Sequence, residues 1–165
     1  MSMKISRRQV LLSGLGVMGS LSVNSLSAFA SENDNTIFQR NGFAIDGYDT
    51  VAYFTQNDAI AGNADFIAQY KGANWIFASA ENRDKFISTP EKYAPQYEGY
   101  CAYAAAQGSV AKIEPDQWKI VEGKLYLNYN FLIKVRWEAS QDDFIKDGNA
   151  KWPTVRPGIK TGRPL

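Results

Sequence analysis

Cys101 is the single cysteine of this 165-residue sequence, and after residue 30 it is the one side chain that could serve as a good nucleophile or a soft metal ligand, because the three methionines lie at positions 1, 3 and 18. The sequence contains no histidine, which excludes a Ser-His-Asp or Cys-His catalytic centre within one subunit. A single cysteine also excludes intrachain disulfides, Cys-x-x-Cys redox pairs and zinc fingers. Two kinds of chemistry remain for the thiolate: exchange with a thiol partner or an oxidant, and binding of a soft metal ion such as copper.

The residues around Cys101 leave its reactivity open. It lies in the apolar and aromatic segment 98–106, where a free thiol commonly packs as a small hydrophobic group. Gly99 permits a sharp bend just before it. If that bend places the sulfur at a helix N-terminus, the free N–H groups there favour the thiolate. We therefore expect a partly accessible Cys101 in a tyrosine-walled pocket, and an oxidised product that is a mixed or intersubunit disulfide or a sulfenate.

Tyrosines and one carboxylate on both sides of Cys101 are candidates for a ligand pocket. The candidate pocket residues are Tyr48, Asp49, Tyr53, Tyr97, Tyr100 and Tyr103. Tyrosines at such spacings more often pack in a core, and Asp49 also suits the N-cap of a short helix over residues 50–54. A metal would have to use Cys101 with oxygen ligands, or Cys101 from both subunits of a homodimer. A closed structural site needs about four ligands and is not expected.

The first thirty residues are typical of an export signal. Arg7 and Arg8 resemble a twin-arginine motif, and they precede an apolar run that glycine and serine dilute. Ala28 and Ala30 supply the small residues that signal peptidase requires. We expect export by the twin-arginine machinery in preference to the Sec route, and a soluble periplasmic product without a membrane anchor.

The mature chain, residues 31–165, carries 15 Lys and Arg against 17 Asp and Glu. Its net charge is near −2, so it has no basic field that would attract nucleic acid or an anionic membrane. The periplasm is oxidising, and a lone exposed thiol would be a liability there.

Two β-hairpins are expected from the alternation of side chains and from turn residues. The first comprises residues 66–78 and turns at 71–74, and the second comprises residues 118–129 and turns at Glu122 and Gly123. The returning strand of the second hairpin has the period of two that predicts a half-buried strand. The predicted core is aromatic and includes Trp75, Phe77, Phe86, Leu125, Leu127 and Trp137.

Capping residues predict four helices. Ser79 starts one that ends near residue 87, and Thr89 with Pro90 starts the next. Asn130 caps a helix over residues 131–139 that is expected to bury Phe131, Leu132 and Val135. The last helix continues from Asp142 to Lys151, where Pro153 is expected to stop it.

These elements predict an α+β fold, with a small antiparallel sheet built from hairpins and short packed helices. The predicted organisation is a cleaved signal at 1–30, a flexible leader at 31–36, one domain at 37–152 and a flexible tail at 153–165.

Five segments resemble the YHS-domain family, specifically its exported bacterial branch. They are residues 47–54, 75–86, 90–97, 99–103 and 124–130, in this order and spacing, so that the resemblance covers about residues 43–152. The family's Tyr-His-Ser triplet corresponds to Phe77-Ala78-Ser79 here, so a methyl group replaces the imidazole. The resemblance implies an α+β domain related to metal-handling proteins. Some relatives have selenocysteine at the position of Cys101, which implies redox or soft-metal chemistry for that sulfur.

Three functions therefore compete. The first is a non-enzymatic periplasmic domain that binds a metal or a small ligand at Cys101. The second is a single-cysteine redox protein that uses Cys101 with a thiol partner. The third is an interaction module that has lost its metal site together with the histidine. We favour the first.

Overall fold

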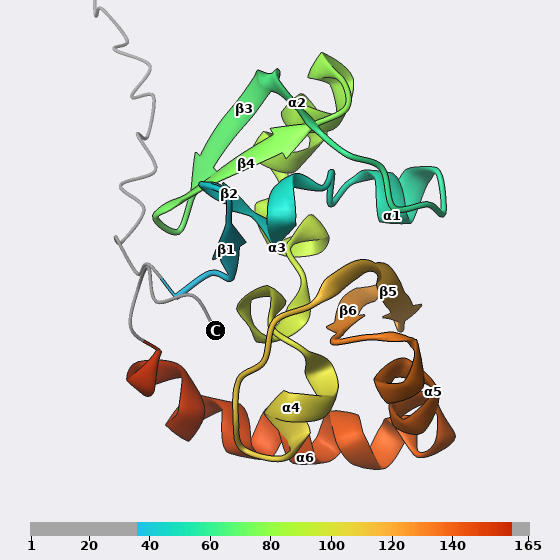
Figure 1. Cartoon of the computed structure of the whole chain (residues 1–165). Helices are drawn as coiled ribbons and strands as arrows, with labels where there is room; N and C mark the ends of the chain where they lie inside the picture. Colours follow the sequence, from blue (N-terminus) through green and yellow to red (C-terminus); the bar gives the residue numbers. More distant parts are fainter. Residues whose placement is uncertain (1–35, 160–165) are drawn as a thin grey trace, which may run out of the picture. The chain divides into compact units, whose positions relative to one another are not determined.

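Short helices alternate with three two-stranded antiparallel sheets along the described part of the chain (Figure 1). The computed structural model describes residues 36–159, so the predicted signal and most of the predicted leader lie outside the described residues. The strands are β1 (Gln39–Arg40), β2 (Phe43–Ala44), β3 (Asn63–Tyr70), β4 (Ala73–Phe77), β5 (Glu114–Val121) and β6 (Lys124–Asn128). The α-helices are α1 (Ala52–Thr55), α2 (Ala80–Ser88), α3 (Pro90–Tyr93), α4 (Ala102–Ala106), α5 (Phe131–Ala139) and α6 (Gln141–Val155). Three 3-10 turns complete the set: η1 (Ile45–Gly47), η2 (Gln96–Gly99) and η3 (Arg156–Gly158). The predicted α+β fold is confirmed.

Both predicted hairpins form. β3 pairs with β4, and the turn between them is the two-residue pair Lys71-Gly72, shorter than the predicted turn. β5 pairs with β6 through Glu122-Gly123, as predicted. The two residues of each turn have positive φ, which is the conformation that tight hairpin turns require.

The predicted helix starts are also confirmed. The Ser79 side chain accepts a hydrogen bond from the Asn82 N–H at 3.2 Å, and Asn130 accepts one from the Ile133 N–H at 2.9 Å. Each cap satisfies one of the backbone donors that a helix N-terminus leaves free. α3 begins at Pro90, with Thr89 at its N-cap.

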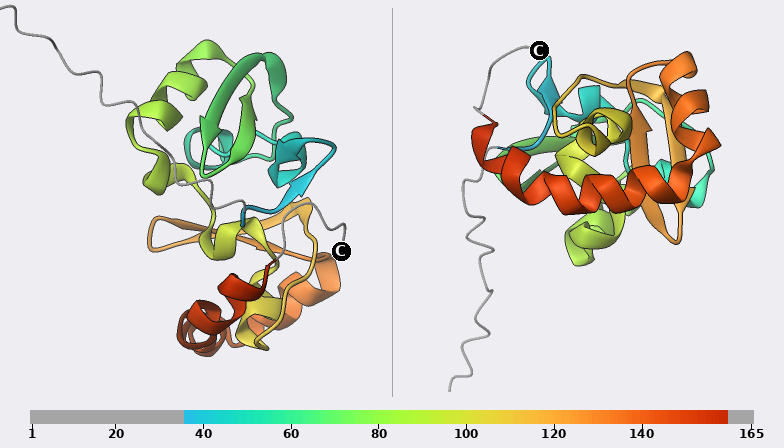
Figure 2. Two further views of the ribbon diagram at one scale, coloured as in Figure 1. Left: turned by 90° about the vertical axis from the view of Figure 1, so that its left-hand side faces the viewer. Right: turned by 90° about the horizontal axis from the view of Figure 1, so that it is seen from below.

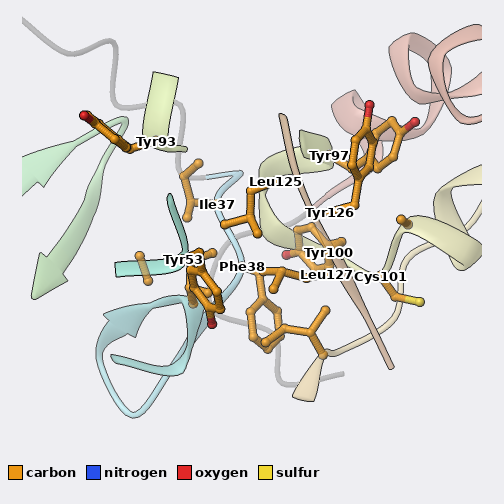
Figure 3. Close-up of a cluster of buried hydrophobic side chains, with 14 of the residues drawn as sticks. Ile37, Phe38, Tyr53, Tyr93, Tyr97, Tyr100, Cys101, Leu125, Tyr126 and Leu127 are labelled. Carbon is orange, nitrogen blue, oxygen red and sulfur yellow. The ribbon is translucent and has the colours of Figure 1, made fainter. Parts of the chain in front are cut away.

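All six predicted core residues are buried. The Phe86 ring lies 4.9 Å from the Trp75 ring and 5.0 Å from the Phe77 ring, which joins α2 to β4. Trp137 packs on Tyr126 at 5.3 Å, which joins α5 to β6. Figure 3 shows the part of the buried cluster around β6 and η2.

The prediction of a half-buried β6 is wrong. Four successive residues of this strand, Leu125 to Asn128, are buried. α3, η2, α4 and α5 all contact β6, so both of its faces are covered. A period of two in the sequence cannot distinguish this arrangement from a strand with one wet face.

The prediction for α5 is also wrong. Phe131, Leu132 and Val135 are 63%, 73% and 47% exposed, respectively, and the inner face of the helix is formed by Trp137 and Ile133 instead. α5 therefore has apolar residues on both faces. A helix with this pattern is usually covered on both sides.

α6 does not stop at Pro153 but continues to Val155, and η3 extends the helical path to Gly158. Pro153 removes only one backbone hydrogen bond near the end of the helix. Trp152 and Arg156 both bond to Glu98, and these contacts hold the last turn in place. Figure 2 shows α6 lying along α4, against which it packs. The first residues of the predicted tail are therefore ordered, whereas residues 160–165 lie outside the described residues. Between residues 36 and 159, no helix is long and apolar enough to cross a membrane.

Candidate functional site

Cys101 lies at the N-cap of α4, as the bend at Gly99 predicted. The backbone N–H groups of Tyr103, Ala104 and Tyr129 lie close enough to the sulfur to lower the pKa of the Cys101 thiol. The thiol lies 3.8 Å from the side-chain oxygen of Asn128, and the Tyr103 N–H donates to the same oxygen at 3.3 Å. The sulfur thus has a set of donors that would stabilise a negative charge.

Burial outweighs these donors. Cys101 is 1% exposed, because α4 covers it and its backbone bridges Leu127 of β6. Desolvation raises the pKa of the Cys101 thiol, although the three N–H groups act in the opposite direction. The prediction of a partly accessible thiol is therefore wrong, and the structure presents a protonated sulfur inside the core.

The surroundings of Cys101 do not fit a copper or zinc ion. Its nearest polar neighbours are N–H donors and one amide, which do not supply the several thiolate, imidazole or carboxylate ligands that these ions need. Over residues 36–159, no three side chains of the His, Cys, Asp and Glu types gather in a way that could hold a metal.

Asp49 is the most completely bonded carboxylate of the described residues, and it is fully buried. Its Oδ1 accepts from the N–H groups of Val51 at 2.9 Å and Ala52 at 3.2 Å, which caps α1 as predicted. Its Oδ2 accepts from the Ala78 N–H at 2.8 Å and from the Asn82 side chain at 2.7 Å. Asp49 therefore joins the start of α1 to the end of β4 and to α2.

The triplet Phe77-Ala78-Ser79 is used for structure at every position. Phe77 is in the core, the Ala78 N–H bonds to Asp49, and Ser79 caps α2. The methyl group of Ala78 offers no ligand to a metal.

The six candidate pocket residues are not brought together in one pocket. The Tyr53 hydroxyl donates to the Pro115 carbonyl at 3.1 Å, Tyr100 packs edge-on against Phe38, and Tyr103 packs on Phe144. Tyr48, which follows η1, forms an isolated antiparallel β-bridge with Ala61 through its backbone. These side chains hold separate parts of the core, and only Tyr97 lines the cleft described next.

A cleft of about 290 Å³ opens where η2 meets α6, and we call it the Glu98 cleft. Its aromatic walls are Tyr70, Tyr97 and Trp152, and its two carboxylates are Glu91 and Glu98. The remaining lining residues are Ile37, Lys71, Ala94, Pro95, Gln96, Asn149 and Pro153. These residues come from four separate stretches of the chain, at 37, 70–71, 91–98 and 149–153, so the cleft exists only in the folded chain.

The backbone around Glu98 is unusual. Tyr97, Glu98 and Gly99 have φ values of 54°, 50° and 83°, so three successive residues adopt the left-handed conformation. This conformation costs a non-glycine residue of the order of 1–3 kcal/mol, and such residues cluster at functional sites. The φ of 83° at residue 99 favours glycine, and a Cβ atom there would require the end of the Ile45 side chain to move.

The Glu98 carboxylate is 13% exposed and points toward α6. The Trp152 indole N–H donates to one of its oxygens, and the Arg156 Nε donates to the other at 2.9 Å. Burial raises the pKa of the Glu98 carboxyl, while the Trp152 hydrogen bond and the charge of Lys71 oppose the rise. A buried carboxyl with a raised pKa in a cleft is a recognised mark of a binding or catalytic site.

The remaining walls of the cleft are also held in place by polar contacts. The Tyr97 hydroxyl can donate to two oxygens of α6: the Ile145 carbonyl at 3.3 Å and the Asn149 side-chain oxygen at 3.2 Å. Gly148 allows this approach, since a Cβ atom there would lie 2.5 Å from the hydroxyl oxygen. The Tyr70 hydroxyl donates to Glu91 at 3.4 Å, and burial together with the Glu91 charge raises the pKa of Tyr70 to about 12.

Comparison with known families matches residues 51–97 to the YHS domain. The chain contains a YHS domain. The comparisons with curated proteins and with solved structures give no match.

The matched segment extends from α1 to Tyr97 in η2. Asp49 lies just before the YHS domain and bonds to four of its residues: to the backbone N–H groups of Val51, Ala52 and Ala78 and to the side chain of Asn82. The domain supplies Tyr70, Glu91 and Tyr97 to the Glu98 cleft, whereas Glu98 and Trp152 lie beyond it. The sequence reasoning missed this cleft because Glu98 and Trp152 are 54 residues apart, and only the pair Glu98-Gly99 marks a local backbone feature.

Proposed function

We propose that the mature chain is an exported, non-enzymatic domain that binds a small ligand in the Glu98 cleft. The observation that carries this proposal is the coincidence of three aromatic walls with a buried carboxylate on a strained backbone. Small-ligand sites are concave and mostly apolar, and they contain a few placed polar groups. The Glu98 cleft has this composition.

The Cys101-centred functions have less support. A metal site lacks ligands around the sulfur, and a redox role would need a thiolate that the buried position disfavours. We therefore keep the small-ligand half of the binding hypothesis and move its site from Cys101 to the Glu98 cleft.

The proposal includes export of the chain, so that the ligand is bound outside the cytoplasm. The proposal rests on Arg7 and Arg8, on the diluted apolar run and on the small residues Ala28 and Ala30. Replacing Arg7 and Arg8 together by Lys should leave the precursor in the cytoplasm, as measured by cell fractionation and immunoblotting. A normal periplasmic yield of this variant would contradict the twin-arginine route.

Ligand binding can be tested by NMR with ¹⁵N-labelled mature protein. The Trp152 indole N–H faces Glu98 and reports on the cleft, and a Trp152→Phe variant assigns its signal. A library of small organic molecules should contain compounds that shift this signal, and Tyr70→Ala should weaken their binding. Tyr129→Ala is the matched control, because Tyr129 is a partly exposed tyrosine away from the cleft. A library without any such compound would contradict the proposal.

A second candidate function is docking of a protein partner on the outer face of α5. The observation that favours it is the exposure of Phe131, Leu132 and Val135 on one helix. Exposed apolar groups gathered in this way mark interaction surfaces. Affinity capture from a periplasmic extract with the mature protein tests it, and Leu132→Asp should release a specific partner while Ile87→Asp, another exposed apolar position, should not.

A further inference from the structure

Two carboxylates, Glu98 and Glu91, line the Glu98 cleft together with the cation Lys71. Among residues 36–159, the Glu98 carboxylate receives hydrogen bonds from Trp152 and Arg156, and the Arg156 contact is also a salt bridge. An ionised carboxylate has about four acceptor positions. Glu91 is exposed and receives a hydrogen bond from Tyr70 at 3.4 Å. A ligand that satisfies the remaining positions must itself bring donors, and preferably a positive charge.

The aromatic walls suit the same kind of ligand. Ring faces of Tyr and Trp attract ammonium groups within about 6 Å of the ring centroid. An ammonium group already occupies this kind of position at the cleft, since Lys71 Nζ lies 5.3 Å from the centre of the Tyr70 ring. The Lys71 charge also acts on Glu98, so this side chain lies within electrostatic reach of both the ring and the carboxylate.

The volume limits the size of the ligand. About 290 Å³ is at the lower end of the range of ligand pockets, which is about 300–1,000 Å³. A single ring or a short chain fits such a space, whereas a nucleotide or a peptide of several residues does not.

We infer that the Glu98 cleft binds a small organic ammonium ion, with Glu98 and Glu91 as its charge partners and Tyr70, Tyr97 and Trp152 as its walls. This inference rests on the proposed function and names its ligand class. Lys71 is then an internal competitor at the Tyr70 ring, and its charge acts on Glu98. Arg156 forms a salt bridge with Glu98 from the α6 side, so Glu91 is the carboxylate with the weaker cationic pairing among the described residues.

Three compounds with the same ring and different charge test the class: benzylamine, which is cationic at neutral pH, benzyl alcohol and benzoate. Each is titrated into ¹⁵N-labelled mature protein while the Trp152 indole signal is followed. Benzylamine should bind at least about tenfold more tightly than the other two. Glu98→Gln should weaken its binding about tenfold or more, and Glu91→Gln should weaken it several-fold.

Two further variants give the inference its specificity. Lys71→Asn removes the competing charge and keeps a residue that tolerates the positive φ of this turn, so benzylamine should bind several-fold more tightly. Glu138→Gln, a half-buried glutamate on α5 away from the cleft, should change nothing. Thermal unfolding of each variant shows whether it folds, and Glu91→Gln tests the charge even if Glu98→Gln is unstable, because Glu91 is exposed.

The outcomes separate the ligand class from the site. Benzoate or benzyl alcohol binding as tightly as benzylamine would overturn the ammonium inference and leave the cleft as a ligand site. Unchanged benzylamine affinity in Glu91→Gln and Lys71→Asn would also overturn it. If neither these compounds nor the wider library shifts the Trp152 signal, the inference and the proposed function fail together.

Discussion

Replacing Asp49 by Ala should destabilise the protein more than any other single carboxylate substitution among the described residues. Asp49 is fully buried and receives four hydrogen bonds from three separate segments. The alanine variant removes the α1 cap, at a cost of about 0.5–2 kcal/mol. It also leaves the Ala78 N–H and the Asn82 amide without a partner, at about 1–3 kcal/mol each. Together these losses amount to about 2.5–8 kcal/mol, and the upper part of this range is comparable to the whole stability of many domains.

Asp49→Asn separates the contributions. The asparagine oxygen can still cap α1, and Asn82 can turn its own amide oxygen toward the new NH₂ group. The Ala78 N–H then faces a donor, so we expect a loss of about 1–3 kcal/mol. The order of stability should therefore be wild type, Asp49→Asn, then Asp49→Ala.

Urea unfolding followed by tryptophan fluorescence measures these differences in the mature protein. Asp65→Ala is the matched control, because Asp65 is exposed and its loss should change the free energy of unfolding by less than about 0.5 kcal/mol. A loss below about 1 kcal/mol for Asp49→Ala, or equal losses for Ala and Asn, would refute the reasoning that Asp49 joins α1, β4 and α2.

Three other predictions follow from the core, from Cys101 and from Glu98. Phe86→Ala should cost about 3–5 kcal/mol in the same urea assay, because Phe86 is buried between Trp75 and Phe77; a loss below about 1 kcal/mol would contradict this packing. Cys101 should react with a small thiol reagent only after the protein is unfolded, since burial raises its pKa and closes access, and fast labelling of native protein at neutral pH would show otherwise. Because burial raises the pKa of Glu98, the folded state keeps this proton at a pH where the unfolded state has lost it. The stability of wild type relative to Glu98→Gln should therefore fall as pH rises from the ordinary value of 4.5 through the folded-state pKa, and a rise over this window would be evidence against the raised pKa.

Local sequence signals were sufficient for the elements whose cause is local. Ser79 and Asn130 cap the helices that follow them, and the Glu122-Gly123 turn adopts the positive φ values that glycine in a hairpin indicates. In each case the deciding contact joins residues within about four positions of each other. The same holds for the cap that Asp49 provides to α1.

Sequence signals failed where the deciding contact is distant. The apolar pattern of α5 offers two possible inner faces, and Trp137 packing on Tyr126 decides between them, so that Leu132 faces outward. Pro153 is a helix breaker in isolation, but Glu98 holds Trp152 and Arg156 on either side of it. The second role of Asp49 depends on Ala78, 29 residues later. The Glu98 cleft depends on α6 meeting η2, which no local pattern encodes.

The state of Cys101 depends on two opposing effects whose balance changes with solvent access. Three N–H groups and the α4 N-terminus favour the thiolate, and desolvation favours the thiol. Desolvation dominates, so the sulfur is protonated and shielded from solvent. The contact between α4 and β6 keeps water from the sulfur, since Cys101 bridges Leu127 of β6 and is 1% exposed. The residues adjacent to Cys101 in sequence supply N–H donors, but burial by these distant segments decides the direction of the pKa shift.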